Sequence, residues 1–258
     1  MTQKANDTKA ALLEYVLGVA DDSLILGQRV SEWLGHAPAM ELDIACSNLA
    51  LDLIGQAQLY YEYAAKLQGE GKSADDLAFL RDGHHFRNHL LVEQPNGDFG
   101  QTIVRHYLFM MFHLKRSELL VGSDDKELAA IAAKTVRELE YHLRFSADWF
   151  RRLALGTDEG NRRIQDGLEN LWSFTFEMFK DVPAETPLYE AGTVPRPSEI
   201  EAGWNAAVAD LLQEAGISPS ARKAAPTKGR IAGHHTEHLG HLLAEMQFLQ
   251  RAYPGLSW

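Results

Sequence analysis

Four histidines and one glutamate stand within nine residues near the C-terminus, in the stretch GHHTEHLGH that begins at residue 233. If this stretch is helical, the side chains of His234, His238 and His241 share one face, because residues three and four apart point the same way. Three imidazoles on one face could hold Zn²⁺. The first candidate chemistry is therefore a zinc site made by these three histidines.

A helix start explains the same residues without a metal. Thr236 is a suitable N-cap, and Glu237 in the first turn would interact favourably with the helix dipole. A glycine-containing loop comes before them, so His234 can precede the first helical turn. We therefore predict that this segment begins a helix and does no chemistry. We expect His235, Glu237 and His238 to form hydrogen bonds across a bundle or at a partner interface, with metal binding as the alternative.

The second candidate chemistry is a di-iron centre inside a helix bundle. Such a centre takes a glutamate from each of two helices and a Glu-x-x-His motif from each of two others, because this spacing points both side chains at the metals. No glutamate of the sequence has a histidine three positions later. The nearest arrangements are Asp52 with Gly55 at the third position, and Glu138 with Tyr141 at the third and His142 at the fourth. Glycine cannot coordinate a metal, so the sequence predicts no metal site of this kind.

Asp52, Glu138 and His142 are therefore interpreted as degenerate ligand candidates. In this interpretation the two carboxylates lie inside the bundle and are hydrogen-bonded or ion-paired rather than bound to metal. The alternative is a working di-iron site with substituted ligands. Asp82-x-x-His85 also has the ligand spacing, but it falls in a predicted loop.

The elements that must position these residues are helices, because apolar residues recur at spacings of three and four along almost the whole chain. The predicted helices cover about residues 9–34, 41–68, 103–122, 124–156, 168–179, 198–216 and 236–252. Two of them are predicted to open on capping boxes, Asp124-x-x-Glu127 and Ser198-x-x-Glu201. Four long helices in succession predict an all-α fold built on a large antiparallel bundle, with the later helices packed around it. We expect one domain, residues 1–258.

Composition narrows the class of protein. Thirty-six acidic against 25 basic residues give a net charge of −11, which disfavours nucleic acid as the main partner. No apolar run approaches the roughly 18 residues that span a bilayer, and the N-terminus lacks the apolar core of a signal peptide. One cysteine, Cys46, cannot form an internal disulfide and is predicted to be a buried apolar side chain. We therefore expect a cytoplasmic protein with no membrane partner.

A basic loop precedes the histidine-rich stretch and stands out against the acidic background. It carries Arg222, Lys223, Lys228 and Arg230 in the sequence ISPSARKAAPTKGR. Cationic side chains bind phosphates, so this loop is a candidate contact for coenzyme A or for an acidic partner. The alternative is a solvated linker.

Five stretches of the sequence carry a resemblance to a known family. They are GQRVSEWLGHAP, NLALDLIGQA, LLVEQPNGDF, YHLRFSADWF and HTEHLGHLLAEMQFLQR, and they extend from about residue 24 to residue 251. The chain resembles the C subunits of the bacterial phenylacetyl-CoA epoxidase, a multicomponent ring 1,2-phenylacetyl-CoA oxygenase. The resemblance implies a ferritin-like long antiparallel four-helix bundle with additional C-terminal helices.

The resemblance also implies a function in phenylacetate catabolism. In that family the homologous A subunit holds the di-iron centre, and the C subunit is a non-catalytic structural subunit that stabilises it and shapes its active site. We therefore expect no cofactor and no catalytic residue in this chain, because Gly55 and Tyr141 stand where histidines would be needed. The expected partners are the A subunit and other subunits of the complex, with phenylacetyl-CoA reached only indirectly and a homodimer when the chain is isolated. The alternatives remain a di-iron oxygenase subunit with substituted ligands and a metal-binding bundle built on the C-terminal histidines.

Overall fold

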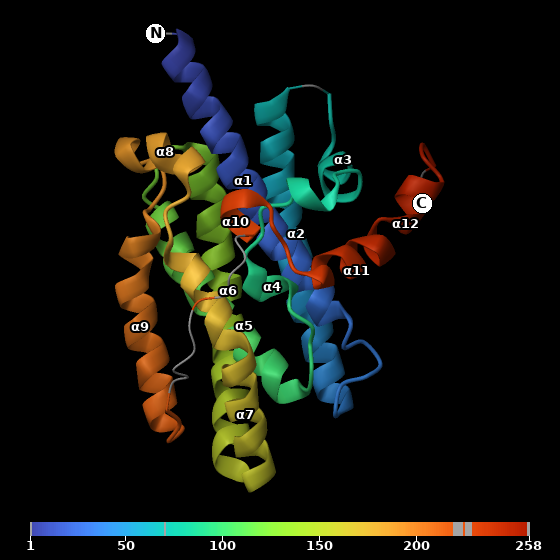
Figure 1. The fold of residues 1–258 in the computed structure, drawn as a ribbon, viewed down its shortest axis with the longest axis vertical. Helices are drawn as coiled ribbons and strands as arrows, with labels where there is room; N and C mark the ends of the chain where they lie inside the picture. The colour runs from blue at the N-terminus through green and yellow to red at the C-terminus, as the bar shows by residue number, and fades with distance from the viewer. Residues whose placement is uncertain (1, 70, 219–223, 225–228, 257–258) are drawn as a thin grey trace. The chain divides into compact units, whose positions relative to one another are not determined.

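Most described residues are helical in the computed structural model (Figure 1), which describes residues 2–69, 71–218, 224 and 229–256. No β-strand occurs among these residues, so the prediction of an all-α fold is confirmed. The chain divides into two compact units: residues 1–95, 182–188 and 227–258 form unit 1, and residues 96–181 and 189–226 form unit 2. Each unit is described by itself, and the expectation of a single domain stays a prediction.

Unit 1 is built on a hairpin of two long helices, α1 (Thr2–Ser31) and α2 (Met40–Gln68), which lie side by side (Figure 1). Their buried residues recur at spacings of three and four, as in Leu49, Leu53, Gln56 and Tyr60 of α2. The helices approach closely at Gly27, where an added Cβ would lie 3.1 Å from Cγ1 of Ile54. The hairpin gives the unit its apolar core.

Shorter elements complete unit 1. They are α3 (Ala74–Phe79), η1 (Gly83–His85), α4 (Leu90–Glu93), η3 (Pro183–Glu185), α10 (Gly229–Ala232), α11 (Glu237–Met246) and α12 (Phe248–Ala252). The helix α8 (Thr186–Ala191) spans the boundary between the units in sequence. Among these elements, α4 and η3 contact α1, α3 contacts α2, and η1 contacts α11.

Unit 2 is centred on α5 (Phe99–Leu120), which contacts α6 (Lys126–Gly156), α7 (Asp158–Leu171) and α9 (Pro197–Glu214). Its apolar core includes Phe109, Leu139 and Phe150, all fully buried or nearly so. The indole Nε1 of Trp204 on α9 donates to the carbonyl of Leu108 on α5 at 2.8 Å. The hairpins α1–α2 and α5–α6 supply the four long helices that a ferritin-like bundle requires, and the fold is consistent with such a bundle.

Several predicted helix ends are wrong by one or two residues. The N-cap of α6 is Asp125 rather than Asp124, because its carboxylate accepts from the backbone N–H groups of Glu127 and Leu128. Helix α9 begins at Pro197 rather than at Ser198, since the fixed φ of proline suits the first helical position.

Two predicted helices are interrupted. The predicted helix over residues 168–179 is α-helical only as far as Leu171, where the 3₁₀ helix η2 (Trp172–Phe179) begins. The predicted last helix is divided at Gln247, whose side-chain amide donates to the carbonyls of Ala78 and Arg81 at 3.1 and 3.0 Å.

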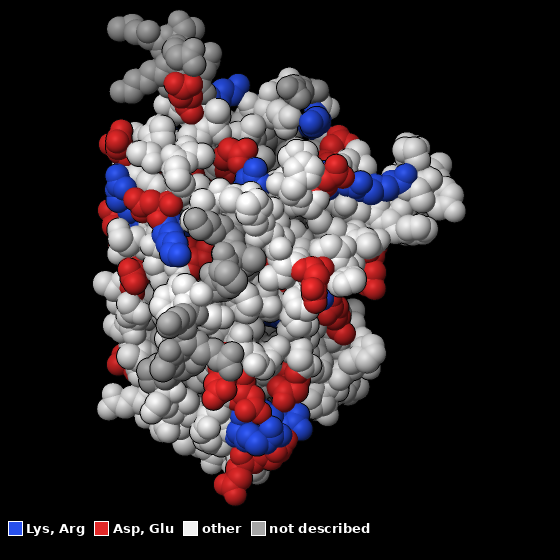
Figure 2. All heavy atoms as spheres, viewed as in Figure 1, with Lys and Arg blue, Asp and Glu red and all other residues white. Residues whose placement is uncertain are grey.

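Charged side chains of both signs are interspersed on the face drawn in Figure 2. On α7, for example, Arg162 binds Glu159 and Asp166, and Arg163 binds Glu159. None of the described helices combines the length and the apolar character needed to cross a membrane.

Candidate functional site

The three degenerate ligand candidates occupy different environments. Asp52 on α2 and Glu138 on α6 are half-buried, whereas His142 on α6 is fully buried. An added Cβ at Gly55 would meet no atom within 4 Å, and Tyr141 is 40% exposed. Among the described residues, none of these side chains belongs to a group of three potential metal ligands.

His142 instead stacks on a second buried histidine of unit 2, His106 on α5. The two ring centroids lie 5.2 Å apart with an interplanar angle of 24°. Burial, followed by the nearby His142 and Arg105, holds the pKa of His106 well below its ordinary value. Neither ring nitrogen of His106 has a hydrogen-bond partner among the described residues. His106 is therefore a neutral core histidine, which its place among apolar residues of α5 could have indicated.

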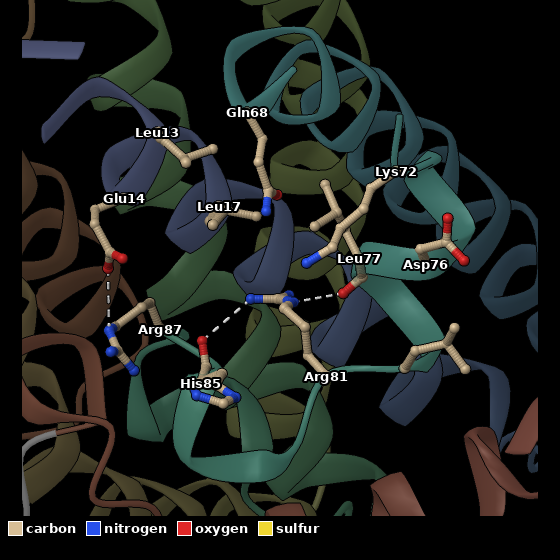
Figure 3. Close-up of a pocket in the computed structure, with 11 residues that line it drawn as sticks. Leu13, Glu14, Leu17, Gln68, Lys72, Asp76, Leu77, Arg81, His85 and Arg87 are labelled. Atoms are coloured by element: carbon tan, nitrogen blue, oxygen red, sulfur yellow. Dashed lines mark hydrogen bonds and ion pairs between the residues drawn. The ribbon is translucent and has the colours of Figure 1, made fainter. Parts of the chain in front are cut away.

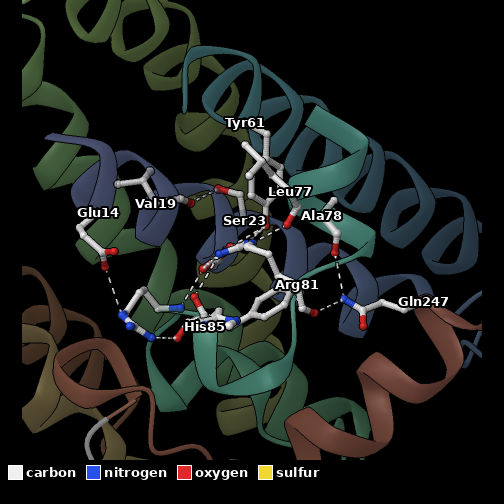
Figure 4. A network of polar contacts seen from close by, with 12 residues as sticks. Glu14, Val19, Ser23, Tyr61, Leu77, Ala78, Arg81, His85 and Gln247 are labelled. Carbon is white, nitrogen blue, oxygen red and sulfur yellow. Dashed lines mark hydrogen bonds and ion pairs between the residues drawn. The ribbon is translucent and has the colours of Figure 1, made fainter. Parts of the chain in front are cut away.

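The polar centre of unit 1 surrounds two adjacent, fully buried carboxylates of α1, Asp21 and Asp22. Asp21 accepts hydrogen bonds from the hydroxyl of Tyr61 at 2.6 Å and from the backbone N–H of Arg87 at 2.7 Å. It also forms an ion pair with the guanidinium of Arg81, which in turn donates to the hydroxyl of Tyr61 (Figure 4). Asp22 accepts from the backbone N–H and the ring Nδ1 of His89, at 2.8 and 3.0 Å. Both carboxylates are thus engaged by protein donors.

Asp21 shifts the pKa values of its two neighbours, Tyr61 and Arg81. Burial raises the pKa of Tyr61 well above its ordinary value, and the charge of Asp21 adds to this effect. Burial alone would lower the pKa of Arg81, but Asp21 and Tyr61 outweigh it and raise that pKa. Arg81 therefore stays charged and Tyr61 stays neutral, so the pair acts as hydrogen-bond donors to Asp21 rather than as an acid and a base.

A third buried carboxylate, Glu93 of α4, holds the start of α11. It accepts from Thr236 through both the backbone N–H at 2.6 Å and the hydroxyl at 2.7 Å. It also binds Nδ1 of His235 at 2.7 Å, while Nε2 of that ring lies 3.0 Å from the carbonyl of Phe86. Burial lowers the pKa of His235, but the hydrogen bond and charge of Glu93 raise it by more. The prediction that His235 forms structural hydrogen bonds is confirmed.

The other predicted roles of the histidine-rich stretch are resolved residue by residue. Thr236 is the N-cap of α11 by position, but its hydroxyl binds Glu93 rather than capping the helix. His234 and His241 are exposed and His238 is half-buried. Among the described residues, these three histidines do not form a group of potential metal ligands. The predicted helix start is confirmed, since α11 begins at Glu237.

The basic loop is described only at its end. Arg222, Lys223 and Lys228 lie outside the described residues. Arg230 does lie within them, and its expected contact with coenzyme A or a partner is wrong for this structure, because its guanidinium is buried. Nη2 binds Glu185 at 2.7 Å, and both side chains are only 4% exposed. The guanidinium occupies the space beside Gly18 of α1, where an added Cβ would lie 1.4 Å from Nη1.

A pocket of about 530 Å³ opens beside this polar centre (Figure 3). Its apolar lining comes from Leu13, Leu17, Leu77 and Leu80. The two arginines of its wall are already bound within the protein. Arg81 donates to the carbonyls of Leu77 and His85, as well as to Asp21, and Arg87 pairs with Glu14. The two arginines therefore stabilise the pocket wall rather than being held ready for an anion.

The comparisons with known proteins agree with the resemblance that the sequence carries. The chain matches the family described as "Phenylacetic acid catabolic protein" over residues 1–258. It is similar to the C subunit of the 1,2-phenylacetyl-CoA epoxidase of Escherichia coli (strain K12), with 46% identity over 247 residues, or 96% of this chain and 99% of that protein. The chain belongs to the family of phenylacetic acid catabolic proteins.

Proposed function

We propose that this chain is the C subunit of a phenylacetyl-CoA epoxidase and that it supports catalysis without performing it. Its similarity to such a protein over almost its whole length supports this assignment. In the complex, the chain would stabilise the homologous A subunit and shape the active site there. Ring epoxidation of phenylacetyl-CoA belongs to the complex, and the di-iron centre to the A subunit.

The observation that carries the non-catalytic role is the state of the buried carboxylates in unit 1. Asp21, Asp22, Glu93 and Glu185 each bind a cationic or hydrogen-bond-donating side chain of the same chain. A metal ion would have to displace these donors before it could bind. Breaking such a buried pair costs about 3–5 kcal/mol, because the partner is left uncompensated. The sequence adds Gly55 and Tyr141 at the positions where the di-iron pattern needs histidines.

Co-expression with the candidate A subunit tests the structural role. We expect the two chains to co-elute in size-exclusion chromatography in mild salt, and the A subunit to be more soluble with its partner than without it. Light scattering on the isolated chain measures any homodimer, since a surface that accepts a homologous partner can accept a second copy. Failure to co-elute would contradict the proposal.

Metal analysis separates the proposal from its enzyme alternative. Tag-free chain purified alone should contain no stoichiometric iron and show no oxidase activity. Iron at about one or two ions per chain, together with activity, would instead favour a di-iron oxygenase subunit with substituted ligands. The matched control is the A subunit purified in the same way.

A further inference from the structure

Hydrogen bonds to its backbone hold the short segment from Asp82 to His85 in place. The N–H of His85 donates to the carbonyl of Asp82 at 2.9 Å, forming the turn of η1. Arg81 donates to the carbonyl of His85 at 3.1 Å, and Arg87 donates to the carbonyl of His84 at 2.8 Å. Both arginines belong to the Asp21 network, Arg81 through its side chain and Arg87 through its backbone N–H. These arginines therefore tie the backbone of the segment to the buried Asp21 network.

Three potential metal ligands project from this rigid segment. One ligand atom from each of Asp82, His84 and His85 lies within 4.8 Å of the other two, and all three residues are exposed. The two imidazole centroids are 3.8 Å apart, with an interplanar angle of 44°. The ring nitrogens of both histidines make no hydrogen bond to any residue that the structure describes. The nitrogens are thus available to a ligand from solvent.

Among the described residues, the carboxylate of Asp82 has one competing partner, Arg251 of α12. Nη2 of Arg251 lies 3.0 Å from Oδ1 of Asp82, and the two side chains are 41% and 62% exposed. The same nitrogen also donates to the carbonyl of Arg81 at 2.8 Å. An exposed pair of this kind contributes about 0–1 kcal/mol, so a metal ion could displace it at little cost.

The ligand set identifies the class of metal. Two imidazoles and one carboxylate suit Zn²⁺ and similar divalent transition metals, whereas Mg²⁺ and Ca²⁺ prefer oxygen ligands alone. Bonds of about 2.0–2.1 Å in a tetrahedral site place ligand atoms roughly 3.4 Å apart. The present separations are at most 4.8 Å, so binding would draw the three exposed side chains together by rotation.

We propose that Asp82, His84 and His85 bind a divalent transition metal of the zinc class, with water completing the coordination. Binding takes the carboxylate of Asp82 from Arg251, so the contact between Asp82 and α12 is replaced by a metal bond. This site is separate from the C-terminal histidine cluster that the sequence suggested. It also does not depend on the proposed function, because its ligands belong to this chain alone.

Isothermal titration calorimetry of the full-length, tag-free chain with Zn²⁺ tests the site by measuring stoichiometry and affinity. We expect one ion per chain, with affinity at least about tenfold weaker in each of His84→Ala and His85→Ala, because each removes one of three protein ligands. The matched control is the double variant His234→Ala/His241→Ala, which removes two exposed histidines and should bind like the original chain. Circular dichroism checks that each variant is folded.

A second variant tests the competition for Asp82. Arg251→Gln should bind Zn²⁺ several-fold more tightly than the original chain, since the carboxylate no longer has to leave an arginine; equal affinity would overturn this exchange. Absence of Zn²⁺ binding, or binding that is unchanged in His84→Ala and His85→Ala, would overturn the site itself. Binding lost in the His234→Ala/His241→Ala control would assign the metal to the C-terminal stretch instead and would also overturn it.

Discussion

Substitution of Gly18 by alanine should destabilise the protein although alanine is the better helix former. Gly18 lies in α1, and the guanidinium of Arg230 fills the space where a side chain would be. A methyl group there would lie 1.4 Å from Nη1, so the guanidinium has to move. Arg230 cannot move far without leaving Glu185, which it binds at 2.7 Å in a site where both side chains are 4% exposed.

The magnitude follows from two opposing effects. Loss of one partner of a buried ion pair costs about 3–5 kcal/mol, because the remaining carboxylate stays buried without its counter-charge. Replacing a helical glycine by alanine contributes about 1 kcal/mol in the opposite direction. We therefore expect Gly18→Ala to lower the free energy of unfolding by about 2–4 kcal/mol. Urea unfolding followed by far-ultraviolet circular dichroism measures this difference.

Gly55 of α2 provides the matched control, because an added Cβ there would meet no atom within 4 Å. Gly55→Ala should leave stability unchanged or raise it by roughly 0.5–1 kcal/mol. In a background of Arg230→Ala with Glu185→Gln, the cost of Gly18→Ala should disappear, since nothing then occupies the space. A Gly18→Ala variant as stable as the original chain would refute the reasoning.

The remaining predictions concern titration and the degenerate ligands. Glu93 raises the pKa of His235 in the folded state, so the loss of stability in His235→Gln should be largest below pH ~6.5 and should diminish as pH rises through the raised pKa. Urea unfolding at several pH values measures the difference in unfolding free energy between the original chain and the variant. A difference that does not change with pH would contradict this prediction. The pKa of His106 is lowered in the folded state, so the original chain should lose stability as pH falls below about 6.5, and His106→Leu should lack that loss. An equal loss in both proteins would contradict it. Glu138→Gln should lower the free energy of unfolding by no more than about 1 kcal/mol and leave assembly and turnover of the epoxidase complex intact. A fully assembled complex with turnover reduced about a hundredfold would place the chemistry in this chain.

The helices could be predicted from the sequence because their signals are local. Apolar residues at spacings of three and four predicted α2 almost to the residue, and the left-handed conformation of Gly69 ends it as expected. Local signals also produced the errors. Asp124 and Asp125 both offer a capping carboxylate, and only the backbone geometry selects Asp125. The aromatic residues after Leu171 continue a helical pattern, yet the chain tightens there into a 3₁₀ helix.

The pairing of buried polar residues could not be predicted, because the partners are distant in sequence. Asp21 and Arg81 are separated by 60 residues, and Glu93 and His235 by 142. The sequence marked His235 as structural but did not reveal its partner. It also presented Arg230 as part of an exposed basic loop, since nothing near it in the chain indicates Glu185. Similarly, the sequence contains the Asp82-x-x-His85 spacing, but only the fold shows the tilted rings of His84 and His85 lying close together near the carboxylate of Asp82.

The buried carboxylates of unit 1 connect the lack of a di-iron motif with the proposed structural role. A metal centre needs carboxylates that the protein leaves available, whereas Asp21, Asp22 and Glu93 are engaged by protein donors. These donors come from residues 61–89 and from residues 235–236, so each hydrogen bond also ties a later segment of the chain to α1 or α4. Carboxylates that could have bound a metal instead connect the helices and loops of the unit through hydrogen bonds and ion pairs. A protein whose task is to hold a partner in shape benefits from this exchange, because its surface is then carried by a rigid core.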